Sequence, residues 1–291
     1  MASQSQKLDK LETCRISKLL PLPNSITKLR DYMILRLPNS IPAAKWQITR
    51  AFSMAWYSSG STNTELVENL FKVELIKNER VKEAMLRVDR AHYAPSRPYS
   101  DSPQAIGHGA TISAPHMHGQ ACEYLVDYLH PGARVLDIGS GSGYLTHVLA
   151  NLVTVPGSSD PGQVIGIDHI PELVELARAN VSKSDDGRKL LESGKVKFIT
   201  ADGRLGWKEG APYDAIHVGA AAEKLHPVLI EQLQAPGRLF IPVESEDDGS
   251  IMSSVNGGQY IWVVDKKADG SVHKQKIFQV RYVPLTDAPR S

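Results

Sequence analysis

The chain has 291 residues, 42% of them hydrophobic, and a formal net charge of +1. This length suffices for one large α/β domain with a buried core and some additional sequence. No run of 18 apolar residues and no compact apolar signal segment occurs, so we expect neither a membrane-spanning helix nor a secretory signal. The two cysteines, Cys14 and Cys122, lie far apart, which argues against a disulfide framework or a zinc site and favours a reducing compartment.

The first 53 residues differ from the remainder in charge. They carry nine Lys or Arg against three Asp or Glu, whereas the remainder has a net charge of −5. A mildly acidic main part argues against a nucleic-acid-binding core, because phosphate contacts need clustered positive charge. We predict that residues 1–53 are an extension and that residues 54–291 form the domain. The extension has three open interpretations: a mitochondrial-type targeting segment, a disordered tail, or sequence upstream of a second start at Met54.

The first predicted helix begins near Thr62. Thr62 and Glu65 have the Thr-x-x-Glu spacing with which side chains accept hydrogen bonds from free amides at a helix start. A second helix is predicted from apolar residues that share one helical face: Val81, Ala84, Met85 and Val88. Prolines then indicate a loop at positions 95, 98 and 103.

From residue 134 onward, short apolar runs alternate with helical segments. The predicted strands are 134–137, 164–168, 196–200, 215–218 and 239–243, and the predicted helices are 144–153, 171–181 and 227–233. This alternation needs crossover connections, so it predicts a mostly parallel central sheet with helices on both faces. Two further strands, 260–265 and 272–282, flank an Asp269-Gly270 turn and predict a C-terminal antiparallel hairpin. The expected fold class is α/β.

A glycine-rich turn follows the first strand of this predicted sheet. Residues 135–144 read Val-Leu-Asp-Ile-Gly-Ser-Gly-Ser-Gly-Tyr, an apolar strand that runs into the turn and then into a helix. Glycines such as Gly139 and Gly141 let the backbone approach a ligand closely, and the helix N-terminus offers free amides. A merely flexible turn is the alternative interpretation of such a run.

Carboxylates end three successive predicted strands. Asp137 lies inside the first, Asp168 ends the second and Asp202 follows the third. In an open α/β sheet these positions share the carboxyl edge, where ligands bind. Asp168 is placed to accept hydrogen bonds from both ribose hydroxyls of a nucleotide, or alternatively to cap the helix that begins at Pro171.

The glycine spacing discriminates between two classes of cofactor. A dinucleotide fingerprint needs Gly-x-Gly-x-x-Gly, but the sixth position from Gly139 is Tyr144. The carboxylate of Asp137 would repel a pyrophosphate, whereas it would attract the cationic amino acid end of S-adenosyl-L-methionine. The sequence therefore favours S-adenosyl-L-methionine.

Several motifs in the sequence are specific enough to indicate a protein family. They are Asp101-Ser102-Pro103-Gln104, Ala110-Thr111-Ile112-Ser113-Ala114-Pro115-His116-Met117-His118, and the segments 136–143, 167–170, 202–204, 213–222 and 282–286. Together they closely resemble the protein-L-isoaspartate O-methyltransferase family, over roughly residues 54–287. The resemblance implies a Rossmann-like class I methyltransferase fold. It also implies an enzyme that transfers a methyl group from S-adenosyl-L-methionine to the α-carboxylate of L-isoaspartyl residues in damaged proteins, which starts repair through a succinimide.

The resemblance also assigns roles to individual residues. Ser113 becomes the catalytic residue, and the residues implied to bind the cofactor are Ala110, Thr111, Ile112, Ser113, His118, Asp137, Gly139, Gly141, Asp168, His169, Asp202, Gly203 and Thr286. An isoaspartyl carboxylate is ionised at neutral pH, so we expect Ser113 to orient it rather than to act as a nucleophile. No metal is expected, because no Cys or further His lies at ligand spacing near His116 and His118. Cys122 is expected to be packed.

Two other functions stay open at this point: a class I methyltransferase for another carboxylate acceptor, and a non-catalytic adaptor that binds the methyl donor. The expected partners are proteins and peptides that contain isoaspartate, with no nucleic acid and no membrane. We expect a cytoplasmic monomer, with organellar targeting by the basic extension as the alternative.

Overall fold

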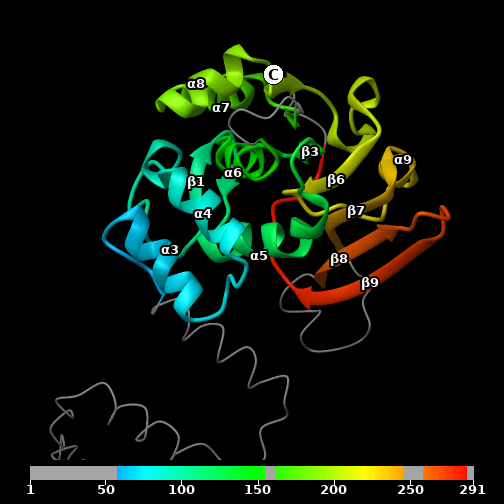
Figure 1. The fold of residues 1–291 in the computed structure, drawn as a ribbon, viewed down its shortest axis with the longest axis horizontal. Coiled ribbons are helices and arrows are strands. Elements are labelled where there is room, and N and C mark those ends of the chain that lie inside the picture. The colour runs from blue at the N-terminus through cyan, green and yellow to red at the C-terminus, as the bar shows by residue number, and fades with distance from the viewer. Residues whose placement is uncertain (1–57, 155–161, 245–257, 287–291) are drawn as a thin grey trace, which may run out of the picture. The chain divides into compact units, whose positions relative to one another are not determined.

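The computed structural model of the chain describes residues 58–154, 162–244 and 258–286 (Figure 1). Every described element belongs to one compact unit, residues 51–291. The predicted extension, residues 1–53, lies outside the described residues. Among the residues in these ranges, no helix has the length and hydrophobicity needed to cross a bilayer.

In the described part of the chain, three α-helices precede the central sheet. α3 (Asn63–Lys72) begins where predicted, and the Thr62 hydroxyl accepts a hydrogen bond from the Glu65 amide at 3.1 Å. The Glu65 carboxylate accepts from the Ser61 amide at 2.8 Å instead of completing the reciprocal pair with Thr62. α4 (Glu79–Arg87) buries its predicted apolar face, and α5 (Pro115–Leu125) has a proline in its first turn, where no amide partner is lost.

A β-hairpin follows the predicted loop and was not itself predicted. β1 (Gln104–Gly107) pairs antiparallel with β2 (Ala110–Ile112). Its turn has three consecutive residues with positive φ: 92° at Gly107, 53° at His108 and 72° at Gly109. The two glycines accept this conformation without steric cost, whereas His108 is a side chain held in the left-handed region.

The central sheet has seven strands in the order β5-β4-β3-β6-β7-β8-β9. Their bounds are β3 (Arg134–Ile138), β4 (Gln163–Asp168), β5 (Val196–Thr200), β6 (Tyr213–Val218), β7 (Leu233–Glu244), β8 (Gln259–Lys266) and β9 (Val272–Gln279). All neighbouring strands from β5 to β7 pair in parallel. β8 pairs antiparallel with β7, and β9 pairs antiparallel with β8 at the edge of the sheet. The predicted α/β fold with a terminal antiparallel hairpin is confirmed.

The helices between the strands agree largely with the prediction. α6 (Tyr144–Val153) and α7 (Pro171–Val181) have the predicted bounds. α8 (Asp185–Glu192) was missed, although the Ser184 hydroxyl caps it by accepting from the Gly187 amide at 3.0 Å. The predicted helix 227–233 was too long: α9 (Pro227–Glu231) stops early because Leu233 already pairs with Tyr213 in the sheet.

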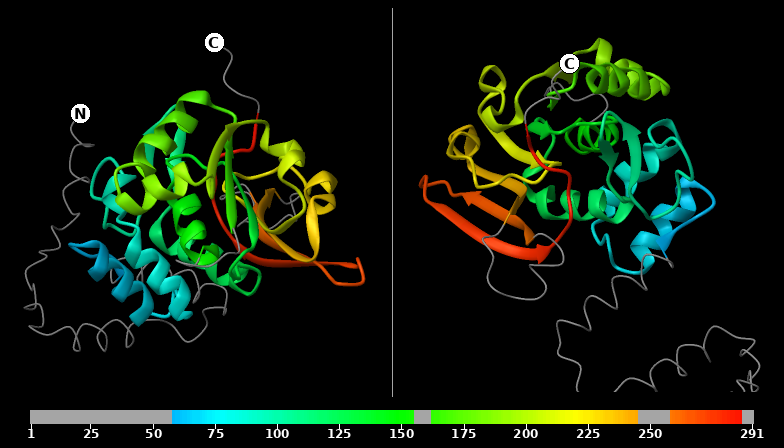
Figure 2. Two further views of the ribbon diagram at one scale, coloured as in Figure 1. Left: turned by 45° about the horizontal axis from the view of Figure 1, so that its top comes forward. Right: turned by 180° about the vertical axis from the view of Figure 1, so that it is seen from behind.

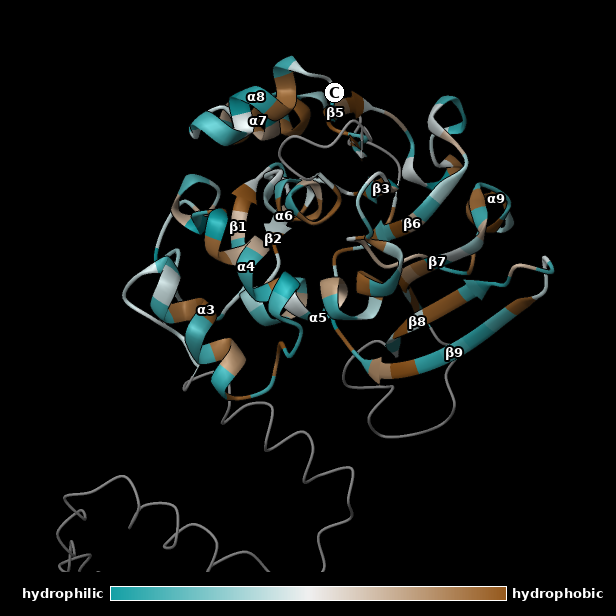
Figure 3. Cartoon of the chain, viewed as in Figure 1, coloured by the Kyte–Doolittle hydropathy of each residue, from teal (hydrophilic) through white to brown (hydrophobic). Residues whose placement is uncertain are grey.

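Side chains of the strands alternate between two hydrophobic clusters, as period 2 requires. On β3, Val135 belongs to a cluster with residues of α3, α4, α5, α6 and α7, whereas Leu136 and Ile138 belong to one that includes Leu229 of α9. Both faces of the sheet are therefore covered. Several helices cover the face that bears Val135, and one short helix and 3₁₀ turns cover the face that bears Leu136 and Ile138. The edge strand β9 is polar and largely exposed (Figure 3).

The chain after β9 returns to the middle of the sheet (Figure 2). The Ala221 amide donates to the Val283 carbonyl at 2.8 Å, and the Leu285 amide donates to the Ala221 carbonyl at 2.7 Å. This return brings residues 282–286 to the end of β6, which positions the site described next.

Candidate active site

A cavity of about 350 Å³ lies where the strand order reverses. β4 pairs with one side of β3 and β6 with the other, and the carboxyl ends around such a reversal form the usual ligand crevice of an open α/β sheet. Its wall comes from the ends of β3 and β4, the start of α7, the β1–β2 turn and the returning segment 283–286. The volume falls in the range of small-molecule sites.

A smaller cavity of about 30 Å³ adjoins the first. The two share Thr111, Gly139, Gly141 and Gly219 as lining residues. The smaller cavity is lined further by Ser113, His118, Asp137 and Tyr144. The site therefore has a large compartment and a small polar one in contact with each other.

The glycine-rich turn between β3 and α6 is tied to β4 by main-chain hydrogen bonds, which favours an ordered turn over a flexible one. The amides of Gly139 and Ser140 both donate to the Ile167 carbonyl, at 2.8 and 3.0 Å. Gly143, at φ 83°, begins α6, and a Cβ there would lie 3.0 Å from the Cβ of Ala177. A side chain at this position would be strained and would also press on α7.

Asp168 lies at the end of β4 and lines the larger cavity. Its Oδ2 accepts from the Gly141 amide and its Oδ1 from the Ile170 amide, both at 3.1 Å. Burial raises the pKa of this carboxyl, while the main-chain donors oppose the rise. The alternative role at the start of the following helix is seen in part, since Asp168 accepts from the amide of Ile170, the N-cap residue of α7. A carboxylate has about four acceptor sites, so Asp168 keeps capacity for ligand hydroxyls.

Asp137, 1% exposed, lies between two donors of the protein. It accepts from the Thr146 hydroxyl at 2.5 Å, and its Oδ1 lies 2.8 Å from Nδ1 of His217. Since it also lines the smaller cavity, it places a buried acidic group beside the glycine turn.

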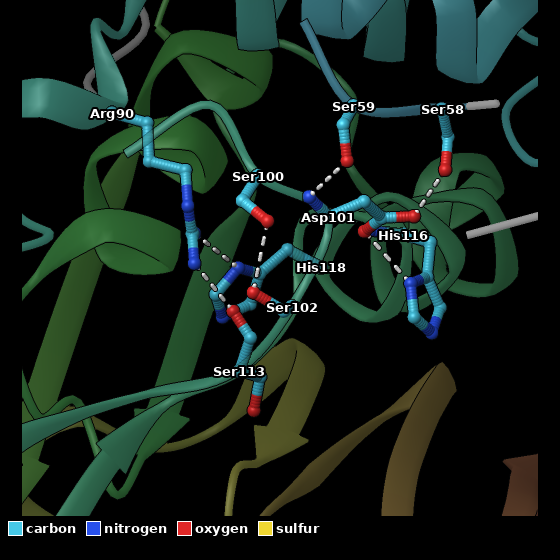
Figure 4. Close-up of polar contacts among 9 residues, drawn as sticks. All are labelled: Ser58, Ser59, Arg90, Ser100, Asp101, Ser102, Ser113, His116 and His118. Carbon is cyan, nitrogen blue, oxygen red and sulfur yellow. Dashed lines mark hydrogen bonds and ion pairs between the residues drawn. The ribbon is translucent and has the colours of Figure 1, made fainter. Parts of the chain in front are cut away.

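The two histidines of the His-x-His motif point to different partners (Figure 4). His116 Nδ1 lies 2.8 Å from the Asp101 carboxylate. His118 Nδ1 lies 3.3 Å from Arg90 Nη1, and Arg90 Nη2 donates to the Ser113 carbonyl at 2.7 Å. Within the described ranges, no three His, Cys, Asp or Glu side chains are arranged to hold a metal ion.

Ser113 follows β2 and presents its hydroxyl to the returning C-terminal segment. The Ser113 side chain shares a hydrogen bond with the Tyr282 hydroxyl, and both residues line the smaller cavity. The contact joins residues 169 positions apart, so the C-terminal segment helps to hold Ser113 in place.

Two hydroxyls in the smaller cavity have no hydrogen-bond partner. Of the buried polar side-chain atoms in the described residues, those without a partner are Arg90 Nε, Ser140 Oγ and Tyr144 Oη. Ser140 and Tyr144 both line the smaller cavity. An unpaired buried polar group costs about 1–3 kcal/mol, so such groups at a cavity point to a ligand.

Tyr144→Phe is accordingly expected to stabilise the ligand-free protein by about 1 kcal/mol, because it removes an unpaired buried hydroxyl. Urea denaturation of both proteins measures this. Tyr93→Phe is the matched control: the Tyr93 hydroxyl lies 2.6 Å from His147 Nδ1, so its removal should destabilise. A clear loss of stability in Tyr144→Phe would show that its hydroxyl is already paired.

The structure brings together nearly all residues that the sequence assigned to the cofactor. Those lining the larger cavity are Ala110, Thr111, Gly139, Gly141, Asp168, His169, Gly203 and Thr286. Those lining the smaller one include Ile112, Ser113, His118 and Asp137. Asp202 lines neither, because its carboxylate forms an ion pair with Arg204, with Oδ2 2.7 Å from Nη2. The prediction for Asp202 has no support from this geometry.

Several lining residues were not predicted: His108, Ser140, Tyr144, Gly219, Ala220 and Tyr282. Four of them lie inside the motifs quoted above and could have been predicted from those motifs: Ser140, Gly219, Ala220 and Tyr282. His108 gives no sequence signal beyond its two flanking glycines.

Comparison with known proteins shows which family this chain is similar to. The profile of the family described as protein-L-isoaspartate(D-aspartate) O-methyltransferase (PCMT) matches residues 61–290. A protein-L-isoaspartate O-methyltransferase of Caenorhabditis elegans is 46% identical over 80% of this chain and 96% of its own length. One of Triticum aestivum is 46% identical over 77% of this chain and 91% of its own.

A solved structure is also similar. A Plasmodium falciparum chain classed as a protein-L-isoaspartate O-methyltransferase, in complex with S-adenosyl-L-homocysteine, superposes with a TM-score of 0.69. It is 34% identical, and the match covers 78% of this chain and 99% of that one. The resemblance seen in the sequence motifs is confirmed, and the chain belongs to the protein-L-isoaspartate(D-aspartate) O-methyltransferase family.

Proposed function

We propose that the two connected cavities are the active site of an enzyme that transfers a methyl group from S-adenosyl-L-methionine to the α-carboxylate of L-isoaspartyl residues in damaged proteins. The observation that carries this proposal is the contact between the larger cavity, with Asp168, and the smaller one, with Ser113. Family membership and the S-adenosyl-L-homocysteine in the similar Plasmodium falciparum structure support it.

The lining fits the cofactor. Asp168 would accept hydrogen bonds from the ribose, while Gly139 and Gly141 allow close approach of the backbone. Asp137 would attract the cationic amino acid end from the smaller cavity. The unpaired hydroxyls of Ser140 and Tyr144 supply the polar contacts that a bound ligand needs. When bound, the cofactor supplies an activated methyl group on a sulfonium.

The protein's own contribution is positioning. An isoaspartyl carboxylate is already ionised at neutral pH, so no strong base has to remove a proton. Holding the reacting atoms in line contributes about 7–11 kcal/mol in favourable cases. The Ser113 hydroxyl, fixed by Tyr282, orients the carboxylate, and the smaller cavity is too small to admit much water beside it. The ester then loses methanol as the following backbone amide attacks, and the succinimide reopens partly to normal aspartate.

The test uses two peptides of one sequence, one with L-isoaspartate and one with L-aspartate at the same position. With radiolabelled S-adenosyl-L-methionine, we expect a base-labile methyl ester on the isoaspartyl peptide alone. Labelling of neither peptide, with cofactor binding intact, would favour the non-catalytic adaptor. Labelling of another carboxylate compound instead would favour the class I methyltransferase with a different acceptor.

Ser113→Ala is expected to lower kcat for the isoaspartyl peptide roughly tenfold, because one oriented hydrogen bond contributes about 1–1.5 kcal/mol. Affinity for S-adenosyl-L-homocysteine should stay unchanged. Ser182→Ala is the control, since the exposed Ser182 hydroxyl donates to the Ala179 carbonyl and lines neither cavity. An unchanged kcat in Ser113→Ala would remove the assignment of Ser113 as the orienting group.

We also propose that the enzyme is a cytoplasmic monomer, since a monomer accepts varied peptides most simply. Organellar targeting by the basic extension is the alternative. Light scattering of the purified chain tests the first point, and imaging of the chain with and without residues 1–53 tests the second.

A further inference from the structure

Arg90, in the 3₁₀ turn η1 (Arg90–His92), is a buried cation that pairs with no carboxylate; Asp101 acts on it through space but forms its own ion pair with His116. Its side chain is 0% exposed, and within the described ranges it forms no ion pair. Its contacts are His118 Nδ1, the Ser113 carbonyl and the face of the Tyr144 ring, 5.1 Å from the guanidinium carbon. A desolvated charge is costly unless an anion compensates it.

The contact with Arg90 fixes the proton on His118. A guanidinium has only donors, so Nδ1 of His118 must accept and the ring proton must lie on Nε2. Burial holds the pKa of His118 well below its ordinary value, and Arg90, His217 and His116 add to this in decreasing order. His118 is therefore a neutral donor in the wall of the smaller cavity.

The charges around the smaller cavity explain the need for such a cation. Its lining contains the Asp137 carboxyl but no Lys or Arg. An incoming carboxylate would thus meet a buried acidic group without any opposite charge from the lining. Arg90 lies one layer behind the wall and contacts the cavity residues Ser113, His118 and Tyr144, so its field reaches the cavity; Figure 4 shows its contacts with Ser113 and His118.

We propose that Arg90 is a positioning residue for the acceptor carboxylate. It fixes His118 as the tautomer that donates from Nε2, it holds the Ser113 main chain, and it supplies the positive charge that the cavity lining lacks. The inference rests on the proposed function, because it takes the isoaspartyl carboxylate to lie beside Ser113 and His118 while the amino acid end of the cofactor lies beside Asp137.

Arg90→Met tests the proposal by removing charge and donors while keeping an apolar side chain over Tyr144. We expect kcat/KM for the isoaspartyl peptide to fall about 100-fold, as misplacement of a reacting group does. Affinity for S-adenosyl-L-homocysteine should stay unchanged. The acid limb of the pH profile of kcat/KM should move to higher pH, because loss of a neighbouring cation raises the pKa of His118 and its neutral form is lost earlier on acidification.

The matched control is Arg238→Met. Arg238 also lies over a tyrosine, 4.9 Å from the Tyr128 ring, but it pairs with Asp265 and lines neither cavity. It should leave kcat/KM and the acid limb as in the wild type. Arg90→Lys keeps the charge and should leave the acid limb in place with a smaller loss of kcat/KM. An acid limb that does not move in folded Arg90→Met, whatever the loss of rate, overturns the proposal.

A measurement on the wild type covers the case in which Arg90→Met does not fold. ¹⁵N NMR of histidine-labelled protein should show His118 protonated on Nε2 and not on Nδ1 at neutral pH. A proton on Nδ1, or a cationic ring, overturns the proposal. This result is independent of turnover, so it is distinguishable from failure of the proposed function, which would appear as wild-type protein that does not methylate the isoaspartyl peptide.

Discussion

Asp168→Ala is expected to weaken the binding of S-adenosyl-L-homocysteine about 100-fold. A hydrogen bond to a charged acceptor contributes about 1.5–3 kcal/mol, and two ribose hydroxyls would share this carboxylate. A loss of about 3 kcal/mol corresponds to the stated factor. The substitution also removes the acceptor for the Gly141 amide, which ties the glycine turn to β4.

Isothermal titration of both proteins measures the effect, and two comparisons sharpen it. Asp202→Ala should have a smaller effect, because the Asp202 carboxylate pairs with Arg204 and lines neither cavity. An analogue that lacks both ribose hydroxyls should bind wild type and Asp168→Ala with similar affinity. Equal affinity of the complete ligand for both proteins would show that Asp168 serves only the main chain.

The sheet and the glycine turn were predictable because they depend on short-range patterns. Apolar runs that end in an acidic residue located the ends of β3 and β4 to within one residue, since strands buried on both faces are continuously apolar. The glycine run between Gly139 and Gly143 likewise marked the turn that lines both cavities. Asp137 and Asp168 were found as site residues for the same reason: topology alone places strand ends together.

The remaining parts of the site depend on contacts between distant residues. Arg90 reaches His118 across 28 positions, and Tyr282 reaches Ser113 from the end of the chain. Nothing local in the sequence distinguishes Arg90 from an exposed arginine. The β1–β2 hairpin was missed because its strands are too short for a clear alternation, and α9 was drawn too long because pairing of Leu233 with Tyr213 outweighs helix propensity.

Asp137→Asn is the second substitution with a large expected effect. We expect it to lower the free energy of unfolding by about 2–3 kcal/mol, because two buried groups share this carboxylate as acceptor and an asparagine amide leaves one of them without an acceptor. Thr146 Oγ1 and His217 Nδ1 both lie within hydrogen-bond distance of this carboxylate, and an asparagine amide would turn an N–H toward one of them. Binding of S-adenosyl-L-homocysteine should weaken as well, since the charge that attracts its amino group is lost.

Asp214→Asn is the matched control for Asp137→Asn. The Asp214 carboxylate accepts from the exposed Arg134 amide at 2.7 Å and lines neither cavity, so we expect a loss below about 1 kcal/mol and unchanged ligand affinity. Urea denaturation with and without ligand separates the two roles of Asp137. Equal loss of stability with and without ligand would limit Asp137 to holding Thr146 and His217. A loss that grows when ligand is present would mean that its charge also acts on the cofactor, because the stabilisation that a bound ligand gives rises with the logarithm of its affinity.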